Sequence, residues 1–513
     1  MNQIGNKRLI INLSANIVSY STNILIAFVL TPYLINTLGK ETYSFYPIAN
    51  NFVAYMCILT NALNSMSSRF VMVSYVKGHM EDVKKFISSV LFSNMIMAML
   101  LLIPMVFIVI FINKIMDVPI NIIASVRILF AFVFSSLLIN ILSSVFGVAT
   151  FVKNRIDLRS IMQLAAGILK ILMFYILFKY FTPTIIYVGI VAFAIALFDS
   201  IFQQYYFKKL MPSIKISASD FSIKHIKKIF SSGSWNSINA IGSLLLTSSS
   251  LIMANIIFGA AAGGVYSIVN TVPIFINGVI SMLVGVFAPT VTYSYALGDK
   301  NILLHNMQKA QAIIGMFSCS VLVVFVCLSQ DFFSLWVPKE NSYLLFILST
   351  ITILPHFFIG CLWPITNLNI AANKVARPAI FQLILGILNI LIVITLSHFF
   401  NTGIITICIV STILSLLYVL VFLPIYAAHY LQLPYTTFYK VVIRMLFSTI
   451  LLFIFLWQIK EYTVLNSWFK LLEMGTFMGI VSIVINFIFI FDQKMKKNTA
   501  SLLLAKLSKR HYK

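Results

Sequence analysis

Hydrophobic runs of membrane-spanning length follow one another along this chain, with short polar segments between them. Roughly 20 apolar residues are needed to cross a bilayer as a helix. We therefore predict an all-α polytopic membrane protein with about 14 transmembrane helices. The predicted spans are residues 9–34, 44–66, 87–112, 122–150, 160–179, 184–207, 234–258, 264–289, 310–330, 342–370, 379–398, 403–426, 441–459 and 470–491.

The second half of the chain repeats the first at a distance of about 220 residues. Repeated pairs are Gly39 and Gly259, Tyr46 and Tyr266, Asn50 and Asn270, Asn154 and Asn373, Gly167 and Gly386, and Phe181 and Phe400. Six is an even number of helices, so two six-helix halves have the same orientation and a pseudo-twofold axis along the membrane normal. The predicted organisation is an N-lobe (1–207, helices 1–6), a cytoplasmic linker (208–233), a C-lobe (234–430, helices 7–12), and helices 13–14 with a basic tail (431–513).

Helices 1, 2, 7 and 8 each carry a stripe of polar side chains. In the first helix the polar residues are spaced 4, 3 and 4 apart, so they share one helix face. A polar stripe is costly against acyl chains, and we predict that the four stripes line a water-filled cavity between the halves. The alternative is that they only bridge helices through hydrogen bonds of about 0.6–2 kcal/mol. The stripe residues are Asn12, Asn16, Ser19, Asn23, Asn50, Asn61, Asn64, Ser232, Asn236, Asn239, Ser243, Asn270, Asn277 and Ser281.

Few ionisable residues fall within the predicted spans, and each is costly there, by about 2.5–3.5 kcal/mol at the bilayer centre. Lys170 lies ten residues into helix 5, whereas its repeat partner is the uncharged Asn389. We assign Lys170, and with it Arg127, to a substrate anion site; Arg127 could instead extend its charge towards the outer surface. Asp199 in helix 6 is a candidate for ion coupling, or else an internal partner of a lysine. His356 in helix 10 is read as a packing histidine, with a proton relay as the alternative.

Composition supports the membrane assignment, because 60% of the 513 residues are hydrophobic and only 10% are charged, against roughly 25% charged in soluble proteins. The formal net charge is +23. With both termini placed in the cytoplasm, and with Lys179, Arg444 and Lys470 near span ends counted with the adjoining loops, the inner segments hold 28 Lys and Arg, the outer segments 6 and the spans 2. This asymmetry follows the positive-inside rule and gives the basic excess a cause other than nucleic-acid binding.

Several classes of chemistry lack their sequence signals. The five cysteines (Cys57, Cys319, Cys327, Cys361 and Cys408) lie in apolar spans without metal-ligand spacing and are read as small core hydrophobes. No phosphate-binding GxxxxGK[ST] motif occurs, and no Ser/His/Asp or metal cluster emerges. We therefore expect neither a cofactor nor a metal, and no enzymatic activity.

Short motifs around the first helices resemble those of a known transporter family. Lys7-Arg8 precedes the polar first helix, Leu38-Gly39-Lys40-Glu41-Thr42-Tyr43 follows it, Arg69 and Gly78 lie in the first inner loop, and Asn154-Arg155 follows helix 4. With two parallel six-helix halves and two further helices, the chain resembles the MOP superfamily of exporters. Within it, the chain is similar to the polysaccharide transporter branch, the Wzx-type flippases of O-antigen and capsule repeat units.

The resemblance implies a flippase that moves undecaprenyl-pyrophosphate-linked oligosaccharides across the inner membrane by alternating access. It implies cationic cavity side chains for the pyrophosphate, which here are Lys170 and Arg127, and membrane lipids and the polysaccharide polymerase machinery as partners. Lipid II flippases carry arginines along helices 1, 2 and 8, where this chain has asparagines, which counts against a peptidoglycan precursor. The alternatives are a cation-coupled multidrug exporter and a membrane-embedded glycosyl- or acyltransferase.

Overall fold

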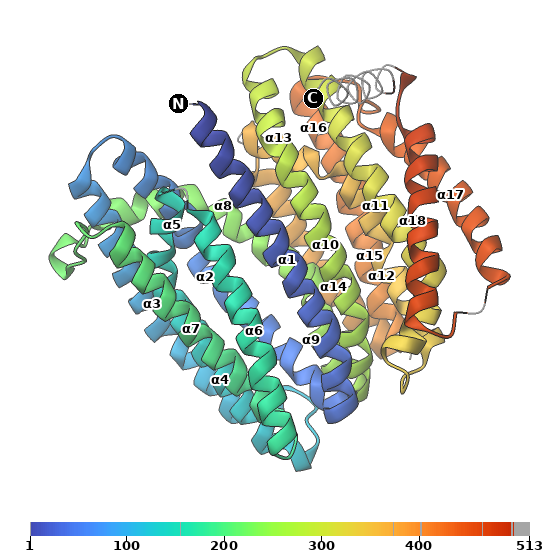
Figure 1. Ribbon diagram of the computed structural model, residues 1–513, viewed down its shortest axis with the longest axis horizontal. Coiled ribbons are helices and arrows are strands. Elements are labelled where there is room, and N and C mark those ends of the chain that lie inside the picture. Colours follow the sequence, from blue (N-terminus) through green and yellow to red (C-terminus); the bar gives the residue numbers. More distant parts are fainter. Residues whose placement is uncertain are drawn as a thin grey trace, which may run out of the picture. The chain divides into compact units, whose positions relative to one another are not determined.

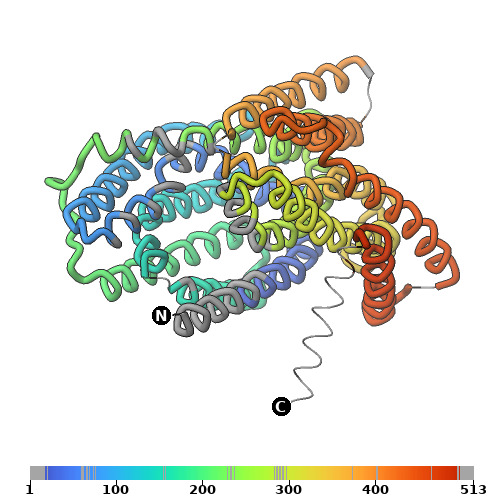
Figure 2. The backbone as a smooth tube through the Cα atoms, turned by 90° about the horizontal axis from the view of Figure 1, so that it is seen from above, coloured from blue at the N-terminus to red at the C-terminus, as the bar shows by residue number. Residues whose placement is uncertain are grey.

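The computed structural model describes residues 2–153, 155–372, 374–400, 403–463, 465–493 and 496, which Figure 2 draws in colour apart from some helix positions in grey. Within helices, some side chains lie outside the description, among them those of residues 2–17. The basic tail beyond residue 496 is outside it as well. Every regular element of the described residues is helical. The prediction of an all-α protein is therefore confirmed.

Eighteen α-helices make up the described chain. They are α1 (Asn2–Leu38), α2 (Lys40–Val76), α3 (Met80–Ile115), α4 (Ile123–Ser143), α5 (Val148–Val152), α6 (Ile156–Tyr180), α7 (Ile186–Leu210), α8 (Ile223–Thr247), α9 (Ser249–Phe258), α10 (Ala260–Ala296), α11 (Lys300–Trp336), α12 (Ser342–Leu362), α13 (Pro364–Ala371), α14 (Ala376–Phe400), α15 (Ile405–Leu416), α16 (Leu423–Leu431), α17 (Tyr439–Glu461) and α18 (Trp468–Ile490). Four single turns connect some of them: η1 (Ile120–Ile122), η2 (Ser144–Gly147), η3 (Ala218–Asp220) and the π-helical η4 (Leu417–Phe422).

Thirteen helical segments of the described residues are long and apolar enough to cross a membrane. The predicted second span lies in α2, a helix of 37 residues that is not among the thirteen. Asn and Ser side chains interrupt its apolar sequence. With α2 counted, the structure agrees with the prediction of about 14 spans.

The helix bounds repeat as the sequence does. Helices α2 and α10 both have 37 residues and are offset by 220, whereas α4 and α12 both have 21 residues and are offset by 219. The turns between helices repeat too: Gly39 and Gly259 have φ values of 82° and 88°, and Gly78 and Gly298 of 76° and 75°. Only glycine adopts this left-handed conformation without a steric penalty. The repeated glycines therefore end equivalent helices in the two halves.

By their internal contacts, the residues form two compact units, and each is described by itself. The first unit contains residues 1–267 and 382–390, and the second contains residues 268–381 and 391–513. In the first unit, α7 packs along α4, and α6 packs against both α7 and α1 (Figure 1). The predicted lobe boundaries of 207 and 234 follow the sequence repeat and remain a prediction.

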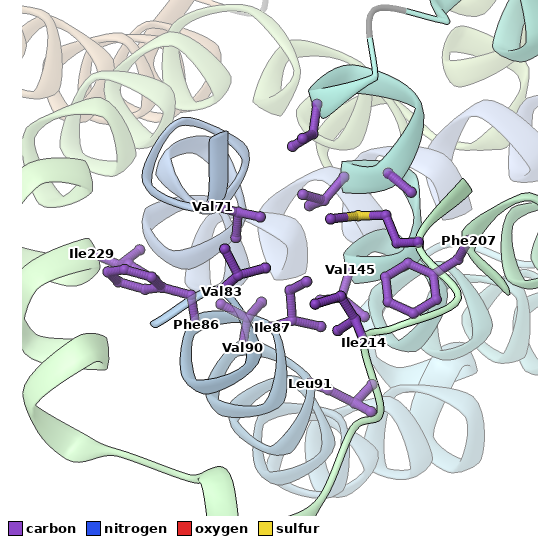
Figure 3. Packing of buried hydrophobic residues seen from close by; sticks show 14 of the residues in the cluster. Val71, Val83, Phe86, Ile87, Val90, Leu91, Val145, Phe207, Ile214 and Ile229 are labelled. Atoms are coloured by element: carbon purple, nitrogen blue, oxygen red, sulfur yellow. The ribbon is translucent and has the colours of Figure 1, made fainter. Parts of the chain in front are cut away.

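A buried hydrophobic cluster fixes one end of the first unit (Figure 3). Val83, Phe86 and Ile87 of α3 pack there with Phe207 of α7 and Ile229 of α8. Residues of the predicted linker between α7 and α8 join this cluster and are hydrogen-bonded to α3. Met211 and Ile214 of the linker are buried in the cluster. The Ser222 amide donates to Ser89 Oγ at 2.9 Å, and the Ser217 amide donates to Ser88 Oγ at 3.3 Å. This linker is therefore packed against α3.

In the second unit, the two C-terminal helices are held on α11 by buried polar contacts. Asn486 of α18 donates to Ser320 Oγ of α11 at 2.9 Å and accepts from Ser448 Oγ of α17 at 2.7 Å. All three side chains are buried. An ion pair between Lys460 and Asp331, 3.3 Å apart, joins α17 to α11 a second time. Because buried amides and hydroxyls are costly to leave unpaired, these contacts fix how α17 and α18 pack on α11.

Candidate substrate-binding site

Helix α6 has two chemically different faces. One face exposes large apolar side chains, including Ile161 (55% exposed), Ile168 (58%) and Leu172 (51%). At 100° per residue, Gln163 and Lys170 lie on the opposite face, two helical turns apart. Gln163 is nevertheless exposed and Lys170 half-buried. The apolar face suits lipid, and the polar face presents an amide and an ammonium group on the other side of the helix.

Helix α1 joins this polar face through two residues of its predicted stripe. The Ser19 hydroxyl, which is 1% exposed, donates to Gln163 Oε1 at 3.0 Å. Asn23, one turn further on, is exposed and donates to the Ser19 carbonyl oxygen at 3.0 Å. The helices approach closely here, since a Cβ on Gly167 would lie 2.7 Å from Ile26 Cδ1. Ser19 therefore fits the helix-bridging alternative, whereas Asn23 remains accessible.

Lys170 differs from its repeat partner in both burial and contacts. Asn389 is fully buried, and its Nδ2 lies 3.4 Å from the carbonyl oxygens of Leu245 and Leu246 at the end of α8. Among the described residues, the Lys170 ammonium group makes no hydrogen bond or ion pair, and Lys170 itself is half-buried. The same position thus bridges two helices in the second half and holds a half-buried cation in the first.

The carboxylate of Asp199 lies half-buried on α7, the neighbour of α6. The positive charge that acts on it is Arg159, an exposed residue in the first turn of α6. The alternative prediction, an internal pair of Asp199 with a lysine, stays a prediction. Arg159 precedes Gln163 by four residues, so it extends the polar face of α6 by one turn. The ion-coupling role of Asp199 stays a prediction.

Arg127 is held by α3. Its Nη2 donates to the Ile110 carbonyl oxygen at 2.9 Å and to Asn113 Oδ1 at 3.1 Å. These hydrogen bonds place the guanidinium group near the C-terminal end of α3, where the helix dipole favours a cation. The placement supports a structural role for Arg127 and leaves Lys170 as the better candidate for the anion site.

The stripe of α2 is divided between bridging and exposed residues. Asn64 Oδ1 accepts from Asn94 Nδ2 of α3 at 3.2 Å and from Ser144 Oγ at 3.3 Å, and Asn94 is fully buried. Asn64 therefore joins three elements, as the bridging alternative proposed. Asn50 is exposed, and its amide donates to the Tyr46 carbonyl oxygen of its own helix at 3.1 Å.

Of the remaining stripe residues that the structure describes, Ser281 donates to the Asn277 carbonyl oxygen of its own helix at 2.7 Å. Half-buried or exposed side chains are Asn239 and Ser243 on α8, and Asn270, Asn277 and Ser281 on α10. The side chains of Asn12, Asn16, Asn61, Ser232 and Asn236 lie outside the described residues. The prediction that the four stripes line one common cavity accordingly stays a prediction.

The histidine and the cysteines within the predicted spans are mostly buried in their helices. His356 is buried in α12, and Cys319, Cys327, Cys361 and Cys408 are buried, whereas Cys57 is half-buried. Among the residues that the structure describes, no group of three His, Cys, Asp or Glu side chains could hold a metal ion. These placements agree with packing roles for the histidine and the cysteines.

Gln163 and Arg159 were not among the predicted site residues. Both lie on the face of α6 that holds Lys170, at spacings of seven and eleven residues before it. Such spacings return to the same side of a helix after two and three turns, so this signal was available in the sequence. Gln and Arg at helical spacing, like Asn and Ser, therefore mark the polar face of a membrane helix.

Cysteine labelling tests whether the polar face of α6 meets water. In a cysteine-free background, Gln163→Cys and Asn23→Cys should react with a small hydrophilic maleimide, because a thiolate forms readily only in water. Ile161→Cys is the matched control, since Ile161 is exposed on the opposite face of the same helix. Equal labelling at residues 161 and 163 would show that the two faces do not differ in access to water.

Three comparisons relate the chain to known proteins. A family model described as "Polysaccharide biosynthesis protein" matches residues 9–294. The chain is 28% identical over 495 residues to the "Uncharacterized membrane protein EpsK" of Bacillus subtilis (strain 168), covering 95% of this chain and 96% of that one. Among solved structures, "Lipid II flippase MurJ, inward closed conformation" is similar with a TM-score of 0.62 at 16% identity, covering 93% of this chain and 99% of the other.

A second solved structure has the same degree of similarity. It is an inward-facing "multidrug resistance MATE family transporter of the MOP superfamily", with a TM-score of 0.62 at 14% identity. The match covers 82% of this chain and 98% of the transporter. At these identities the likeness concerns the fold, and the fold is that of flippases and transporters.

Proposed function

We propose that this chain, which belongs to the polysaccharide biosynthesis protein family and has the fold of MOP-superfamily transporters, is a flippase for undecaprenyl-pyrophosphate-linked oligosaccharides. It would carry these repeat units across the cell's inner membrane by alternating access, for the synthesis of O-antigen, capsule or another surface polysaccharide. The similarity to a structure titled a lipid II flippase supports a lipid-linked substrate.

The observation that carries the proposal is the half-buried Lys170 on a polar face of α6. A pyrophosphate can accept charge-assisted hydrogen bonds from an ammonium group, and these are stronger than neutral ones. Exposed Gln163 and Asn23 offer amide donors and acceptors, which suit sugar hydroxyl groups. The polar face of α6 and the adjoining α1 thus present groups for both the charged and the sugar parts of such a substrate.

A cation-coupled multidrug exporter is the second candidate, because the MATE fold is similar and Asp199 lies half-buried on α7. Binding a cationic substrate or coupling ion requires an available carboxylate. Asp199 is the one carboxylate deep within a predicted span, whereas Lys170 offers a cation to an anionic substrate. This set of charges favours an anionic substrate over a cationic one.

The orientation in the membrane can be tested with reporter fusions. The charge asymmetry between inner and outer segments predicts that both termini are cytoplasmic. Fusions at the C-terminus should be active with a cytoplasmic reporter, and insertions at Lys40 and Gly259 with a reporter that works only outside. An external C-terminus would contradict both the orientation and an even number of spans.

Complementation tests the function itself. A bacterial strain that lacks its own repeat-unit flippase should regain surface polysaccharide when this chain is expressed at low level. The control strain also lacks the transferase that starts the repeat unit, and it should gain none. Restored resistance to cationic drugs without restored polysaccharide would favour the multidrug exporter instead.

A further inference from the structure

A row of aromatic side chains runs along the twelfth predicted span. Tyr418, Phe422 and Tyr426 follow one another at four-residue intervals across η4 and α16. Neighbouring ring centroids are 6.1 Å and 5.6 Å apart, and the ring planes differ by only 12° and 11°. Phe381 of α14 stacks on Phe422 at 4.1 Å and 8°. These four side chains, here called the aromatic strip, are all half-buried.

Phe381, which belongs to another helix, lies against one face of the Phe422 ring. A residue four positions along a helix lies about 6 Å further along its axis, which matches the centroid spacings within the row. The three rings of the row are therefore nearly parallel and offset from one another along the helix.

The equivalent positions of the first half hold no such row. At the offset of 219 residues that relates Lys170 to Asn389 and α4 to α12, Tyr418 and Phe422 correspond to Asp199 and Gln203. The row coincides with the π-helical turn η4, and the span that contains it has 27 residues against 25 in α7. Turns of this kind occur often at functional sites.

Polar groups border the strip at one end. Arg377 lies one turn before Phe381 in α14, is exposed, and acts electrostatically on the Tyr426 hydroxyl. Beyond Tyr426, the Tyr430 ring turns by 63° and its hydroxyl donates to Asn369 Oδ1 at 3.0 Å, which ends the row. A row of nearly parallel aromatic rings thus lies beside a guanidinium group with five hydrogen-bond donors.

We propose that the aromatic strip binds hexopyranose rings of the transported oligosaccharide. A pyranose ring has a face of C–H groups that matches the negative face of an aromatic ring in size and charge. The Tyr418 and Tyr426 hydroxyls and the Arg377 guanidinium can bind the equatorial hydroxyl groups at the ring edge. Because every hexopyranose presents C–H groups in this way, the strip would accept different sugars. The inference rests on the proposed function and assigns it a sugar-binding surface.

Binding of two lipid probes to the full-length protein in lipid nanodiscs tests this inference. One probe is undecaprenyl pyrophosphate, and the other carries an N-acetylhexosamine disaccharide on the same lipid. Wild type should bind the disaccharide probe more tightly. Phe422→Leu should weaken only that binding, by about tenfold, the equivalent of about 1.4 kcal/mol, and Phe422→Tyr should retain it. Val421→Ala is the matched control, because Val421 is 47% exposed on the adjacent apolar face.

The outcomes separate this inference from the proposed function. Equal binding of the two probes by wild type, or an equal loss of both in a Phe422→Leu variant with the wild-type melting temperature, overturns the sugar-binding strip alone. Unchanged disaccharide binding in Phe422→Leu overturns it as well. If wild type binds neither probe, the proposed function fails and the strip loses its ligand with it.

Discussion

Replacing Lys170 by glutamine is expected to remove most of the export activity while the protein remains in the membrane at its normal abundance. A half-buried ammonium group that binds pyrophosphate gains about 1.5–3 kcal/mol from each charge-assisted hydrogen bond. Losing about 1.4 kcal/mol lowers the binding constant tenfold, so export at limiting substrate should fall by about tenfold or more. The measurement is surface polysaccharide restored to a flippase-deleted strain.

Two control variants separate charge from structure at this position. Lys170→Arg keeps the positive charge and should retain much of the activity. Lys179→Gln removes a charge from the same helix, where Lys179 is exposed and its Nζ lies 2.8 Å from Tyr175 Oη, and it should have little effect. The fold does not require a cation at this repeat position, because the second half has Asn389 there. Full complementation by Lys170→Gln at matched low expression would contradict the anion-site role.

Replacing Gly242 by alanine should lower the free energy of unfolding more than any other substitution proposed here. A Cβ at Gly242 of α8 would lie 2.6 Å from the Leu383 amide nitrogen and 2.7 Å from the Gln382 carbonyl carbon of α14. Both atoms belong to a helix backbone, so neither can move aside as a flexible side chain could. Overpacking of this kind costs about 1–3 kcal/mol or more. The melting temperature of the purified protein and its abundance in membranes should both fall.

Gly479→Ala provides the matched control for this substitution. Gly479 lies within α18, and a Cβ there would meet no heavy atom within 4 Å. Alanine has the higher helix propensity, by about 1 kcal/mol in a helix interior, so Gly479→Ala should leave the melting temperature unchanged or raise it slightly. Equal melting temperatures for Gly242→Ala and wild type would show that α8 and α14 do not pack this closely in the membrane.

The repeat and the spans could be predicted from the sequence because hydrophobic length and turn glycines act locally. Gly39 and Gly259 mark equivalent helix ends whatever lies beside them. The roles of the polar residues could not be predicted in the same way. Asn50 is exposed, while the adjacent Asn51 donates to the Ser248 carbonyl oxygen at 3.0 Å. Which of two neighbouring asparagines bridges helices depends on a partner about 200 residues away.

For the charged residues, too, the position along the helix follows from the sequence, whereas the contacts depend on how distant helices pack. The depth of Lys170 in its helix follows from counting residues. The charges near Asp199 do not, because Arg159, which acts on it electrostatically, lies on another helix, and their distance depends on how α6 packs against α7. The hydrogen bonds of Arg127 to α3 depend likewise on the packing of two helices. Sequence patterns thus located the candidate residues, and the packing distinguished Lys170 from the others.

Translocation in a reconstituted system tests the proposed function most directly. Purified protein is inserted into liposomes that carry undecaprenyl-pyrophosphate-linked disaccharide in both leaflets, and a glycosidase that cannot cross the bilayer is added outside. Protein-free liposomes should lose only the sugar of the outer leaflet. With the wild-type protein, we expect the inner-leaflet sugar to become accessible and to be cleaved as well, and Lys170→Gln should slow this second phase. If wild-type vesicles lose no more sugar than protein-free ones, the chain is not a flippase for this class of lipid.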